Sequence, residues 1–341
     1  MTKSAVIFGG CGFIGLFYAE KVLKLGFYDN LYLVDIFEPK DEYCLNKYKK
    51  LLNDKKVKFI KKDIRENLND LRVEGKVNII LNFAAVHREP GHKANEYFET
   101  NINGAQNICN FAKLIDCKNI IFTSSIAVYG QGDHIKNEDT IVNPSTPYGK
   151  SKYSAEKIHI QWKNENINEH ILSICRPGVV YGPGEKGNIT RLVKFVKKKI
   201  FFYMGNNQVK KGGIYIKELI NILIWVNQNQ LKNKIPNYAL FNASIDPCPT
   251  LQTYVEKISK IYNYSGNFLT IPKFMIKIFL SISMIFTTIF KLNNSFSYYR
   301  LIKLFRHNNI VPNFLNKNNY VFLYDISKSL KDWKRINPSD W

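Results

Sequence analysis

A run of three regularly spaced glycines near the start of the chain constrains its fold more than any other feature. An apolar stretch at residues 5–8 leads into Gly9, Gly12 and Gly15, and a segment with helical character follows at residues 13–25. Such glycines allow a sharp turn out of a strand, a close approach of backbone to a pyrophosphate, and tight packing of the next helix on the sheet. The helix N-terminus then faces the phosphates. The pattern predicts a dinucleotide-binding loop rather than a purely structural glycine turn.

An acidic residue ends the second predicted strand, at residues 31–35. This residue, Asp35, lies twenty positions after Gly15. A carboxylate at this place accepts hydrogen bonds from both ribose hydroxyls and repels a 2′-phosphate, so the expected cofactor is NAD rather than NADP. The alternative is a solvated acid at a strand end. The predicted cofactor-binding residues of this first unit are Gly9, Gly12, Phe13, Ile14, Gly15 and Asp35.

Strand-like and helix-like segments alternate through the first half of the chain, as in a doubly wound parallel sheet. The predicted fold class is α/β, a Rossmann-type doubly wound sheet with a smaller, interleaved C-terminal substrate lobe. After residue 185 the chain leaves the sheet, and it returns for one more unit before leaving again. We expect the NAD-binding domain to comprise residues 1–185 and 215–246, and the substrate lobe residues 186–214 and 247–341.

Short polar or small residues follow the third and fourth predicted strands, at the edge where open α/β sheets bind ligands. Asp63 and Ile64 follow the third strand, and Asp63 is expected to reach the adenine amino group. Ala84 and Ala85 follow the fourth strand, where small side chains let the chain pass close to the nicotinamide ribose. A helix is expected next, over residues 95–114.

The next strand and helix carry residues suited to proton transfer. A strand at residues 119–123 delivers Ser125 to the same edge of the sheet, and Tyr148 and Lys152 open a helix that reaches about residue 164. Residues four apart share one helical face, so the ammonium of Lys152 can act on the phenol of Tyr148. A nearby cation lowers the pKa of a tyrosine and prepares its phenolate to take a hydroxyl proton.

Composition excludes several other classes of protein. The chain has 341 residues, of which 45% are hydrophobic, enough for one large α/β domain with a smaller lobe. Its cysteines form no C-x-x-C pair and suggest no zinc site, disulfide framework or other metal site; they are Cys11, Cys44, Cys109, Cys117, Cys175 and Cys248. A reducing cytoplasm fits this usage, and no removable leader is expected before the first strand.

The chain is strongly basic, with a formal net charge of +21. The charge is unevenly distributed, because no acidic residue lies between Glu256 and Asp325. A basic surface can attract nucleic acid, but the sequence carries no helix-turn-helix, zinc-finger or RNA-binding signature. Nucleic acid is therefore not an expected partner.

Several motifs beyond the glycine loop give the sequence a family resemblance. It resembles the extended short-chain dehydrogenase/reductases, specifically the NAD-dependent sugar epimerase/dehydratase family. The middle of the chain, residues 118–227, is especially similar to bacterial C4 epimerases of surface-polysaccharide pathways, which act on UDP-hexoses or on undecaprenyl-diphosphate-linked N-acetylglucosamine. The motifs are residues 122–130, 147–152, 176–177 with 181–184, and 324–328 with 332–333.

The resemblance implies an isomerase, an NAD-dependent C4 epimerase of an activated hexose that serves surface polysaccharide biosynthesis such as that of O-antigen. Tyr148 would remove the C4 hydroxyl proton, Ser125 would hydrogen-bond the same oxygen, and Lys152 would hold the nicotinamide ribose and tune Tyr148. Hydride would pass from C4 to NAD and return to the other face of a transient 4-keto sugar. A homodimer is also expected.

Two other functions stay open at this point. A 4-keto-6-deoxy-sugar reductase that uses NAD(P)H can employ the same Ser, Tyr and Lys, although Asp35 argues against NADPH. A non-catalytic NAD-binding protein could keep the fold, although decay usually removes the tyrosine first. Dehydration is not expected, because 4,6-dehydratases usually have Asp-Glu where this chain has Ile126 and Ala127.

The resemblance also identifies candidates for contact with the activated sugar. His87 follows the Ala84–Ala85 turn, and Asn188 matches a usual substrate-contacting position. Lys210 and Lys211 stand near the place where the family often has an arginine for the diphosphate, and lysine holds a phosphate without the bidentate fork. The predicted substrate-binding residues are His87, Ser125, Asn188, Lys210 and Lys211. They leave open whether the diphosphate is joined to a nucleotide or to a lipid.

A final feature is the apolar stretch at residues 278–290, which is bounded by Lys277 and Lys291. Its thirteen residues are too few to span a bilayer. Lysines share one helical face over residues 271–292, as in a helix that lies on a membrane surface. We expect either peripheral contact with the anionic inner face of the membrane or a helix packed on the lobe.

Overall fold

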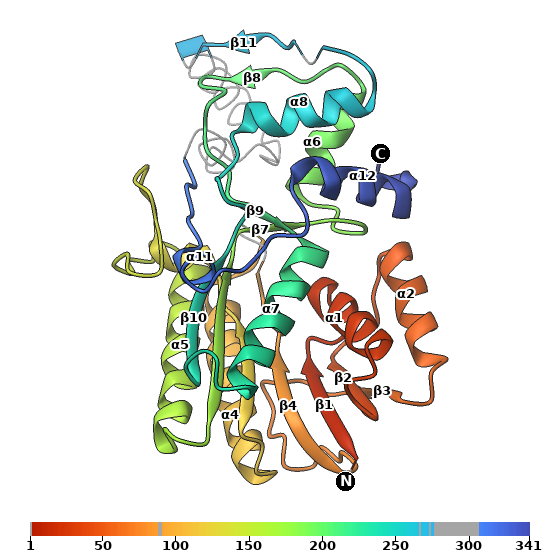
Figure 1. Cartoon of the computed structure of the whole chain (residues 1–341), viewed down its shortest axis with the longest axis vertical. Coiled ribbons are helices and arrows are strands. Elements are labelled where there is room, and N and C mark those ends of the chain that lie inside the picture. The colour runs from red at the N-terminus through yellow and green to blue at the C-terminus, as the bar shows by residue number, and fades with distance from the viewer. Residues whose placement is uncertain (1, 88–90, 266, 273, 276–306) are drawn as a thin grey trace, which may run out of the picture.

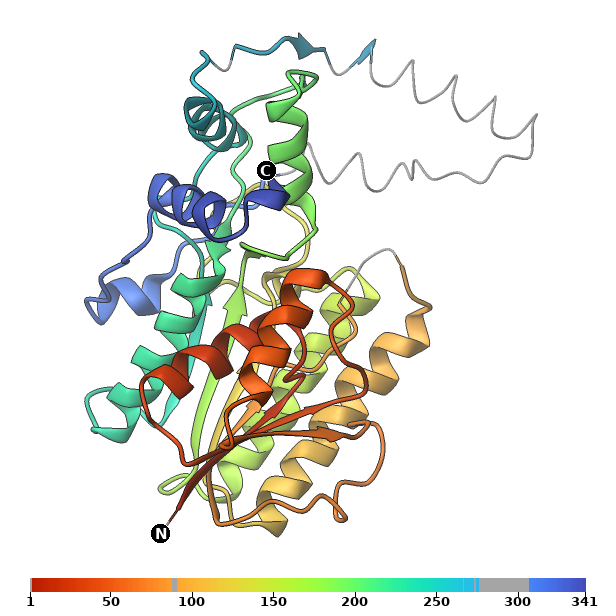
Figure 2. The same ribbon diagram turned by 90° about the vertical axis from the view of Figure 1, so that its right-hand side faces the viewer.

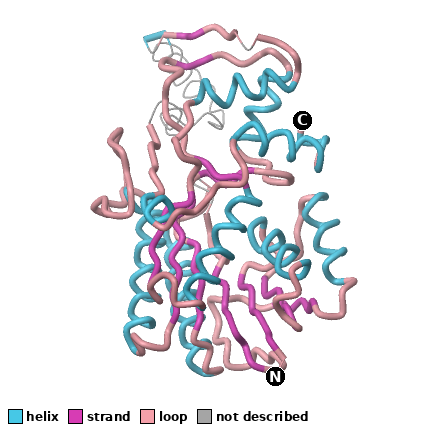
Figure 3. The backbone as a smooth tube through the Cα atoms, viewed as in Figure 1, coloured by secondary structure: helices cyan, strands magenta, loops and turns pink. Residues whose placement is uncertain are grey.

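The computed structural model describes residues 2–87, 91–265, 267–272, 274–275 and 307–341. Its main feature is a seven-stranded sheet in the order β10-β6-β5-β4-β1-β2-β3, in which every pairing is parallel. Figure 3 shows the strands in magenta with helices in cyan around them. The prediction of a doubly wound parallel sheet is confirmed. The strands are β1 (Lys3–Phe8), β2 (Asn30–Asp35), β3 (Val57–Lys61), β4 (Lys76–Asn82), β5 (Asn119–Thr123), β6 (Ile171–Pro177) and β10 (Tyr238–Ala243).

Helices cover both faces of this sheet (Figures 1 and 2). Alternate residues of β1 show how the two layers form: Ile7 belongs to one buried cluster, and its neighbour Phe8 belongs to the other. Successive side chains of a strand point to opposite faces, so an apolar strand feeds two cores. The first cluster includes residues of α1 (Phe13–Lys24), α2 (Glu42–Leu52) and α7 (Ile216–Leu231), and the second includes residues of α4 (Gly104–Leu114) and α5 (Pro147–Glu165).

The helix predicted over residues 95–114 is present, but its middle part is π-helical rather than α-helical. The segment consists of α3 (Ala94–Phe98), a π-helical stretch η1 (Glu99–Asn103) and α4. A π-helical turn inserts one extra residue per turn and displaces the side chains that it carries. Asn101 lies in this stretch and is buried, so the interruption turns a polar side chain towards the interior.

A smaller lobe lies above the carboxyl edge of the sheet in Figure 1. The short ladder of β7 (Val179–Tyr181) with β9 (Gly213–Tyr215) follows the sheet at this edge. Strand β10 pairs with β6 in the main sheet although the lobe elements α6 and β8 precede it in the chain. The remaining elements are η2 (Ile126–Tyr129), α6 (Asn188–Lys197), β8 (Tyr203–Met204), α8 (Leu251–Ile261), β11 (Thr270–Ile271), α11 (Asn313–Lys317), α12 (Ile326–Ile336) and η3 (Pro338–Asp340).

The exact limits of the two predicted domains, including the breaks at residues 185, 214 and 246, stay a prediction. The membrane-surface helix predicted at residues 271–292 lies outside the described residues, apart from the few that adjoin β11. Among the residues that the structure does describe, no helix is long and apolar enough to cross a bilayer.

A buried ion pair fixes α5 to the sheet. Arg176 at the end of β6 makes a two-pronged contact with Glu156, with its Nε 2.9 Å and its Nη2 2.7 Å from the two carboxylate oxygens. The remaining Nη1 donates to the hydroxyl of Tyr129 at 3.1 Å. Because both charged partners are almost fully enclosed, neither can be removed without leaving an unpaired buried charge.

We predict that Glu156→Ala lowers the free energy of unfolding by about 3–5 kcal/mol, because it leaves the Arg176 guanidinium buried without its partner. Glu165→Ala is the matched control on the same helix, since its ion pair with Lys113 is exposed. Exposed pairs contribute about 0.2–1 kcal/mol. Urea-induced unfolding of both variants measures the difference, and equal effects would contradict the role given to the buried pair.

Candidate active site

The glycine loop presses against the end of the neighbouring strand. Gly9 has a φ of +75°, and a Cβ at this position would lie 2.6 Å from the backbone N of Ala84 and 2.7 Å from the carbonyl carbon of Phe83. No side chain fits in that space. Strand β1 pairs with β2 on one side and β4 on the other, so the loop occupies the point where the strand order reverses and open sheets bind ligands.

Two further glycines allow close packing around this loop, Gly15 between α1 and the loop and Gly10 between the loop and β2. A Cβ on Gly15 would lie 2.4 Å from the Gly9 carbonyl oxygen, and one on Gly10 would lie 2.7 Å from the Leu33 Cα. Gly12 caps α1 in an extended conformation without any side-chain hydrogen bond, and a Cβ there would meet only the Gly9 carbonyl oxygen, at 3.1 Å. The N-H groups of the first turn therefore have no side-chain acceptor at the cap. This cradle fits the pyrophosphate of a dinucleotide.

Asp35 joins the end of β2 to the same loop. Its carboxylate accepts hydrogen bonds from the backbone N-H of Cys11 at 3.1 Å and of Ile36 at 2.8 Å. Burial raises the pKa of this carboxyl above its ordinary value, and the backbone donors oppose that rise. The side chain is only half-buried, so it is not the freely solvated acid of the alternative interpretation. Its position allows it to hold the loop and to accept from ribose hydroxyls.

The predicted adenine contact is less open than the sequence suggests. Both carboxylate oxygens of Asp63 accept hydrogen bonds from the Arg65 side chain, at 2.6–3.1 Å. The Arg65 side chain holds the pKa of Asp63 below its ordinary value. Ile64 lies in the same loop, and its backbone carbonyl accepts a hydrogen bond from the Asn107 side-chain amide at 2.9 Å. A surface pocket of about 550 Å³ lies beside these residues and is lined by Ile36, Phe37, Lys61, Lys62, Asp63, Arg65, Glu66 and Asp70.

Asn101 holds the segment after β4, a role that sequence reasoning missed. Its side chain pairs with both backbone groups of Val86, accepting from the N-H at 3.0 Å and donating to the carbonyl at 3.1 Å. The same amide nitrogen donates to Ser151 Oγ at 2.8 Å. Asn101 therefore connects the Ala84–Ala85 turn to α5. The sequence signal for this role is that Asn101, a polar residue, lies between Tyr97 and Ala105 on the apolar face of the predicted helix.

Ser125 lies directly beyond the end of β5 and begins η2. Its Oγ accepts a hydrogen bond from the backbone N-H of Ala127 at 3.1 Å. This contact uses an oxygen lone pair and leaves the hydroxyl hydrogen to donate elsewhere. The residue is nearly buried, so a partner for that hydrogen would be held in a largely water-free setting.

Tyr148 lies in the first turn of α5, which packs directly on η2. A Cβ at Gly149 would lie 2.6 Å from the carbonyl oxygen of Ala127, so the helix start and the Ser125 turn are in contact. Thr146 caps the helix by accepting from the Gly149 N-H at 3.1 Å. The Tyr148 ring centroid lies 6.1 Å from that of Tyr97 on α3. These contacts place Tyr148 and Ser125 on adjoining segments.

Lys152 lies one turn further along α5 and is almost completely buried. Its Nζ lies 4.4 Å from the ring centroid of Phe122 on β5. Burial lowers the pKa of this ammonium to about 7, and the carboxylate of Glu156 opposes the shift. An anion formed nearby, such as the Tyr148 phenolate, would stabilise the charged form of Lys152.

A neutral histidine packs on the same phenylalanine ring as this lysine. His159 stacks on Phe122 with centroids 4.2 Å apart, and burial lowers its pKa to about 4. Its Nδ1 lies 2.7 Å from the Ala155 carbonyl, so Nδ1 carries the proton and Nε2 accepts from the Asn82 amide at 3.3 Å. The Asn82 Oδ1 and the hydroxyl of Ser124 are buried without a hydrogen-bond partner among the described residues. Unpaired polar atoms at these strand ends suit a polar ligand.

The predicted substrate residues are more dispersed. His87 is exposed beside the Ala85 carbonyl, and Asn188 is exposed at the first position of α6. The Lys210 ammonium donates a hydrogen bond to the backbone carbonyl of Cys248 at 3.0 Å and so connects two segments of the lobe. Lys211 is half-buried, and burial lowers its pKa to about 8. Contact of Lys210 or Lys211 with a diphosphate stays a prediction.

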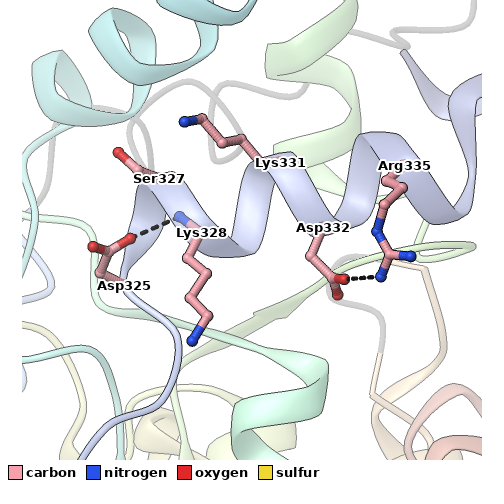
Figure 4. A pocket seen from close by; sticks show the side chains of 6 residues that line it. All are labelled: Asp325, Ser327, Lys328, Lys331, Asp332 and Arg335. Atoms are coloured by element: carbon pink, nitrogen blue, oxygen red, sulfur yellow. Dashed lines mark hydrogen bonds and ion pairs between the residues drawn. The ribbon is translucent and has the colours of Figure 1, made fainter.

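A second surface pocket lies on α12, outside the predicted site (Figure 4). It measures about 470 Å³ and is lined by Asp325, Ser327, Lys328, Lys331, Asp332 and Arg335. Asp332 pairs with Arg335 at 2.7 Å, so its charges are partly matched within the helix. Within the described part of the chain, no group of three or more His, Cys, Asp or Glu side chains could hold a metal ion.

Comparison with known proteins places the chain in one family. The sequence model of the 3-beta hydroxysteroid dehydrogenase/isomerase family matches residues 6–271. The structure is similar to that of UDP-glucuronic acid 4-epimerase from Bacillus cereus in complex with NAD, with a TM-score of 0.74 and 18% identity. That similarity covers 99% of this chain and 100% of the other, and it supports the fold.

Two curated relatives are more similar in sequence. The N-acetyl-alpha-D-glucosaminyl-diphospho-ditrans,octacis-undecaprenol 4-epimerase of Escherichia coli O157:H7 is 30% identical over 194 residues, which are 57% of this chain and 57% of that protein. The UDP-glucose 4-epimerase of Vibrio cholerae is 35% identical over 133 residues, which are 38% of this chain and 40% of that protein. The chain thus spans little more than half the length of the first relative.

We predict that Lys152→Met, without added cofactor, raises the free energy of unfolding more at about pH 7 than at about pH 10. In the folded protein the lysine pKa is about 7 rather than its ordinary 10.5. Between these values the unfolded chain binds a proton that the folded protein does not, so the destabilising effect of Lys152 fades as pH rises. Lys150→Met, at an exposed position of the same helix, is the control, and an equal pH dependence there would contradict the assignment.

Proposed function

The chain belongs to the 3-beta hydroxysteroid dehydrogenase/isomerase family, within the extended short-chain dehydrogenase/reductases, and on this premise we propose that it is an NAD-dependent C4 epimerase of an activated hexose. The observation that carries the proposal is the contact between α5 and η2. It brings the segments of Tyr148 and Ser125 together beyond the end of β5, at the same edge of the sheet as the glycine loop that follows β1.

The cofactor residues fit NAD. Gly12 and the first turn of α1 would hold the pyrophosphate, Asp35 would accept from the adenosine ribose, and the Ala84–Ala85 turn would pass near the nicotinamide ribose. Ile64 would flank the adenine. Asp63 would also contact the adenine, while its carboxylate keeps part of its pairing with Arg65. Bound NAD would supply a reversible two-electron acceptor for oxidation of a carbon that bears a hydroxyl group.

The residues of the chain then have defined roles in proton transfer. Tyr148 takes the proton of the C4 hydroxyl as a general base and gives it back at the end of the reaction. Ser125 donates a hydrogen bond to the same oxygen with its hydroxyl hydrogen, which the contact from the Ala127 N-H leaves available. Lys152, held over Phe122, gains its charge as the phenolate forms and keeps that phenolate accessible near neutral pH.

The alternatives fit less well. Ile126 and Ala127 begin η2, so the positions that hold an acid pair in 4,6-dehydratases carry no titratable group here. A reductase would commonly use NADPH, whose 2′-phosphate the Asp35 carboxylate would repel. A non-catalytic NAD-binding protein would have no need of a buried lysine one helical turn after a tyrosine. We therefore favour an epimerase over a 4-keto-6-deoxy-sugar reductase.

The activated sugar carries a diphosphate that is linked either to a nucleotide or to a lipid. The relative from Escherichia coli O157:H7 acts on a sugar joined to undecaprenol through diphosphate, and the one from Vibrio cholerae is a UDP-glucose epimerase. Lys211 would meet the diphosphate in either case. We place the reaction in surface polysaccharide biosynthesis, such as that of O-antigen, in a cytoplasmic homodimer. Peripheral contact with the inner face of the membrane would bring a lipid-linked substrate within reach.

We predict that the purified protein inverts C4 of at least one activated hexose without net consumption of reduced cofactor. UDP-glucose, UDP-N-acetylglucosamine and diphosphate-lipid-linked N-acetylglucosamine are the substrates to test, with products separated by sugar configuration. Tyr148→Phe should reduce turnover about 10²- to 10⁴-fold while NAD binding remains.

Tyr153→Phe, on the same helix, is the matched control and should turn over normally. Stoichiometric consumption of NADH would instead identify a reductase. NAD binding without turnover of any of the three substrates would favour a non-catalytic protein.

We predict that Asp35→Asn narrows the preference for NAD over NADP by about tenfold or more, because it removes the charge that repels a 2′-phosphate while keeping an acceptor for the Cys11 N-H. Calorimetric titration of both cofactors measures the ratio of dissociation constants. Asp63→Asn is the control, since the carboxylate of Asp63 is directed to Arg65. An unchanged ratio in Asp35→Asn would remove Asp35 from cofactor selection.

A further inference from the structure

The far end of the substrate lobe exposes large apolar side chains. It is formed by the C-terminal end of α6 and by the pairing of β8 with β11, which lie at the top of Figure 1, opposite the amino edge of the sheet. Exposure ranges from 44% for Phe202 to 83% for Leu269. We call this set the tip patch, and it consists of Phe195, Ile200, Phe202, Leu269, Phe274 and Met275.

The local structure holds part of this patch outwards. Residues 201–203 alternate, with Phe201 partly buried, Phe202 exposed and Tyr203 buried. Phe201 packs edge-on against Phe268 with centroids 5.3 Å apart, and against Tyr203 at 5.1 Å. Successive residues of an extended chain point in opposite directions, so Phe202 is directed away from this aromatic layer.

The two chain segments that form the tip patch are basic and contain no acidic residue. No Asp or Glu lies between Glu185 and Glu218, and none lies between Glu256 and Asp325. The first acid-free stretch contains β8 and the second contains β11, so the parallel pairing of these strands brings the two stretches side by side at the tip. Five cationic side chains on or just after α6 are exposed, namely Arg191, Lys194, Lys197, Lys198 and Lys199.

Helix α6 presents both an exposed apolar side chain and exposed cations on its outward face. Its buried positions, Ile189, Val193 and Val196 among them, face the lobe. The opposite face carries Arg191, Lys194, Phe195 and, just beyond the last turn, Lys198, which are spaced as neighbours on a helix. The outward face of α6 thus presents one apolar side chain, Phe195, among cations, and such cations are attracted to an anionic lipid surface.

From these observations we infer that the tip patch docks on an anionic lipid bilayer. Apolar side chains would enter the interface, and the lysines on and after α6 would bind acidic headgroups. Glu256 on α8 is an acidic residue close enough to act on Tyr203 of β8, and the exposed cations of α6 outnumber it. The inference rests on the proposed function only for its purpose, which is to bring the sugar-binding lobe to a lipid-linked diphosphate. Binding to the bilayer itself requires no catalysis.

Charge argues against the other occupants. A two-fold contact with a second copy would bring Lys198 and Lys199 against their own counterparts. The acid-free sequence between residues 276 and 306 carries the same sign of charge and gains nothing electrostatically from covering the tip. A nucleic acid would neutralise the lysines but would leave the aliphatic side chains Ile200 and Leu269 without an apolar partner.

The test is sedimentation of the full-length protein with phosphatidylcholine vesicles that do or do not contain phosphatidylglycerol, at low and at high salt. We expect the protein to bind the anionic vesicles, with partial release at high salt because surface charges are screened. Phe202→Glu with Leu269→Glu should weaken this binding about tenfold or more. Lys194→Gln with Lys198→Gln should reduce the salt dependence.

Leu231→Glu with Ile167→Glu is the matched control, since both residues are exposed apolar residues outside the lobe. It should bind vesicles like the wild type. The inference is overturned if the wild type ignores anionic vesicles at low salt, or if the tip variant that keeps its unfolding temperature still binds fully. A protein that dimerises in solution and becomes monomeric in the tip variant, without vesicle binding, would assign the patch to a second copy.

Failure of this inference and failure of the proposed function can be told apart. Turnover of UDP-linked sugars is measured without vesicles, and the tip variant should retain that turnover. Vesicle binding by a protein that turns over no sugar would overturn the proposed epimerase and leave the docking surface standing. Turnover of a sugar without vesicle binding would overturn the docking surface and leave the proposed epimerase standing.

Discussion

The close approach of the backbone at Gly9 to the turn after β4 is the constraint on which the rest of the site depends. Because a Cβ at this position would lie only 2.6 Å from the backbone N of Ala84, glycine alone permits β1 and β4 to end side by side. Gly15 then lets α1 settle on the same loop, and Asp35 ties β2 to it through Cys11. One set of backbone contacts thus orders the cofactor edge of three strands.

The side of the candidate site that carries Tyr148 is ordered by a second set of contacts, centred on the first turns of α5. Gly149 packs on η2, Ser151 receives a hydrogen bond from Asn101, and Lys152 is enclosed over Phe122. Glu156 continues the series one turn later by pairing with Arg176. Because the enclosed lysine readily loses its charge, the site is suited to a reaction in which a neighbouring anion forms and disappears.

Those parts of the account that depend on local backbone requirements could be predicted from the sequence. Glycine spacing and alternating strands and helices indicated the fold, and strand ends indicated Asp35 and Ser125. Contacts between distant segments could not be predicted in this way. Asn101 acts through Ser151, fifty residues away, and its π-helical turn has no signature in a helix pattern. The Lys210 ammonium is directed by the carbonyl of Cys248, and only the folded lobe brings these two together.

The measurement that tests the central claim most directly follows the hydrogen atom on C4 of the sugar. An activated hexose deuterated at C4, turned over in ordinary water with a trace of NAD, should give a C4-inverted product that retains the deuterium at C4. This result is predicted because the hydrogen removed while Tyr148 takes the hydroxyl proton is returned to the same carbon within one site. Replacement of the deuterium by hydrogen from solvent, or a product without inversion, would contradict the account.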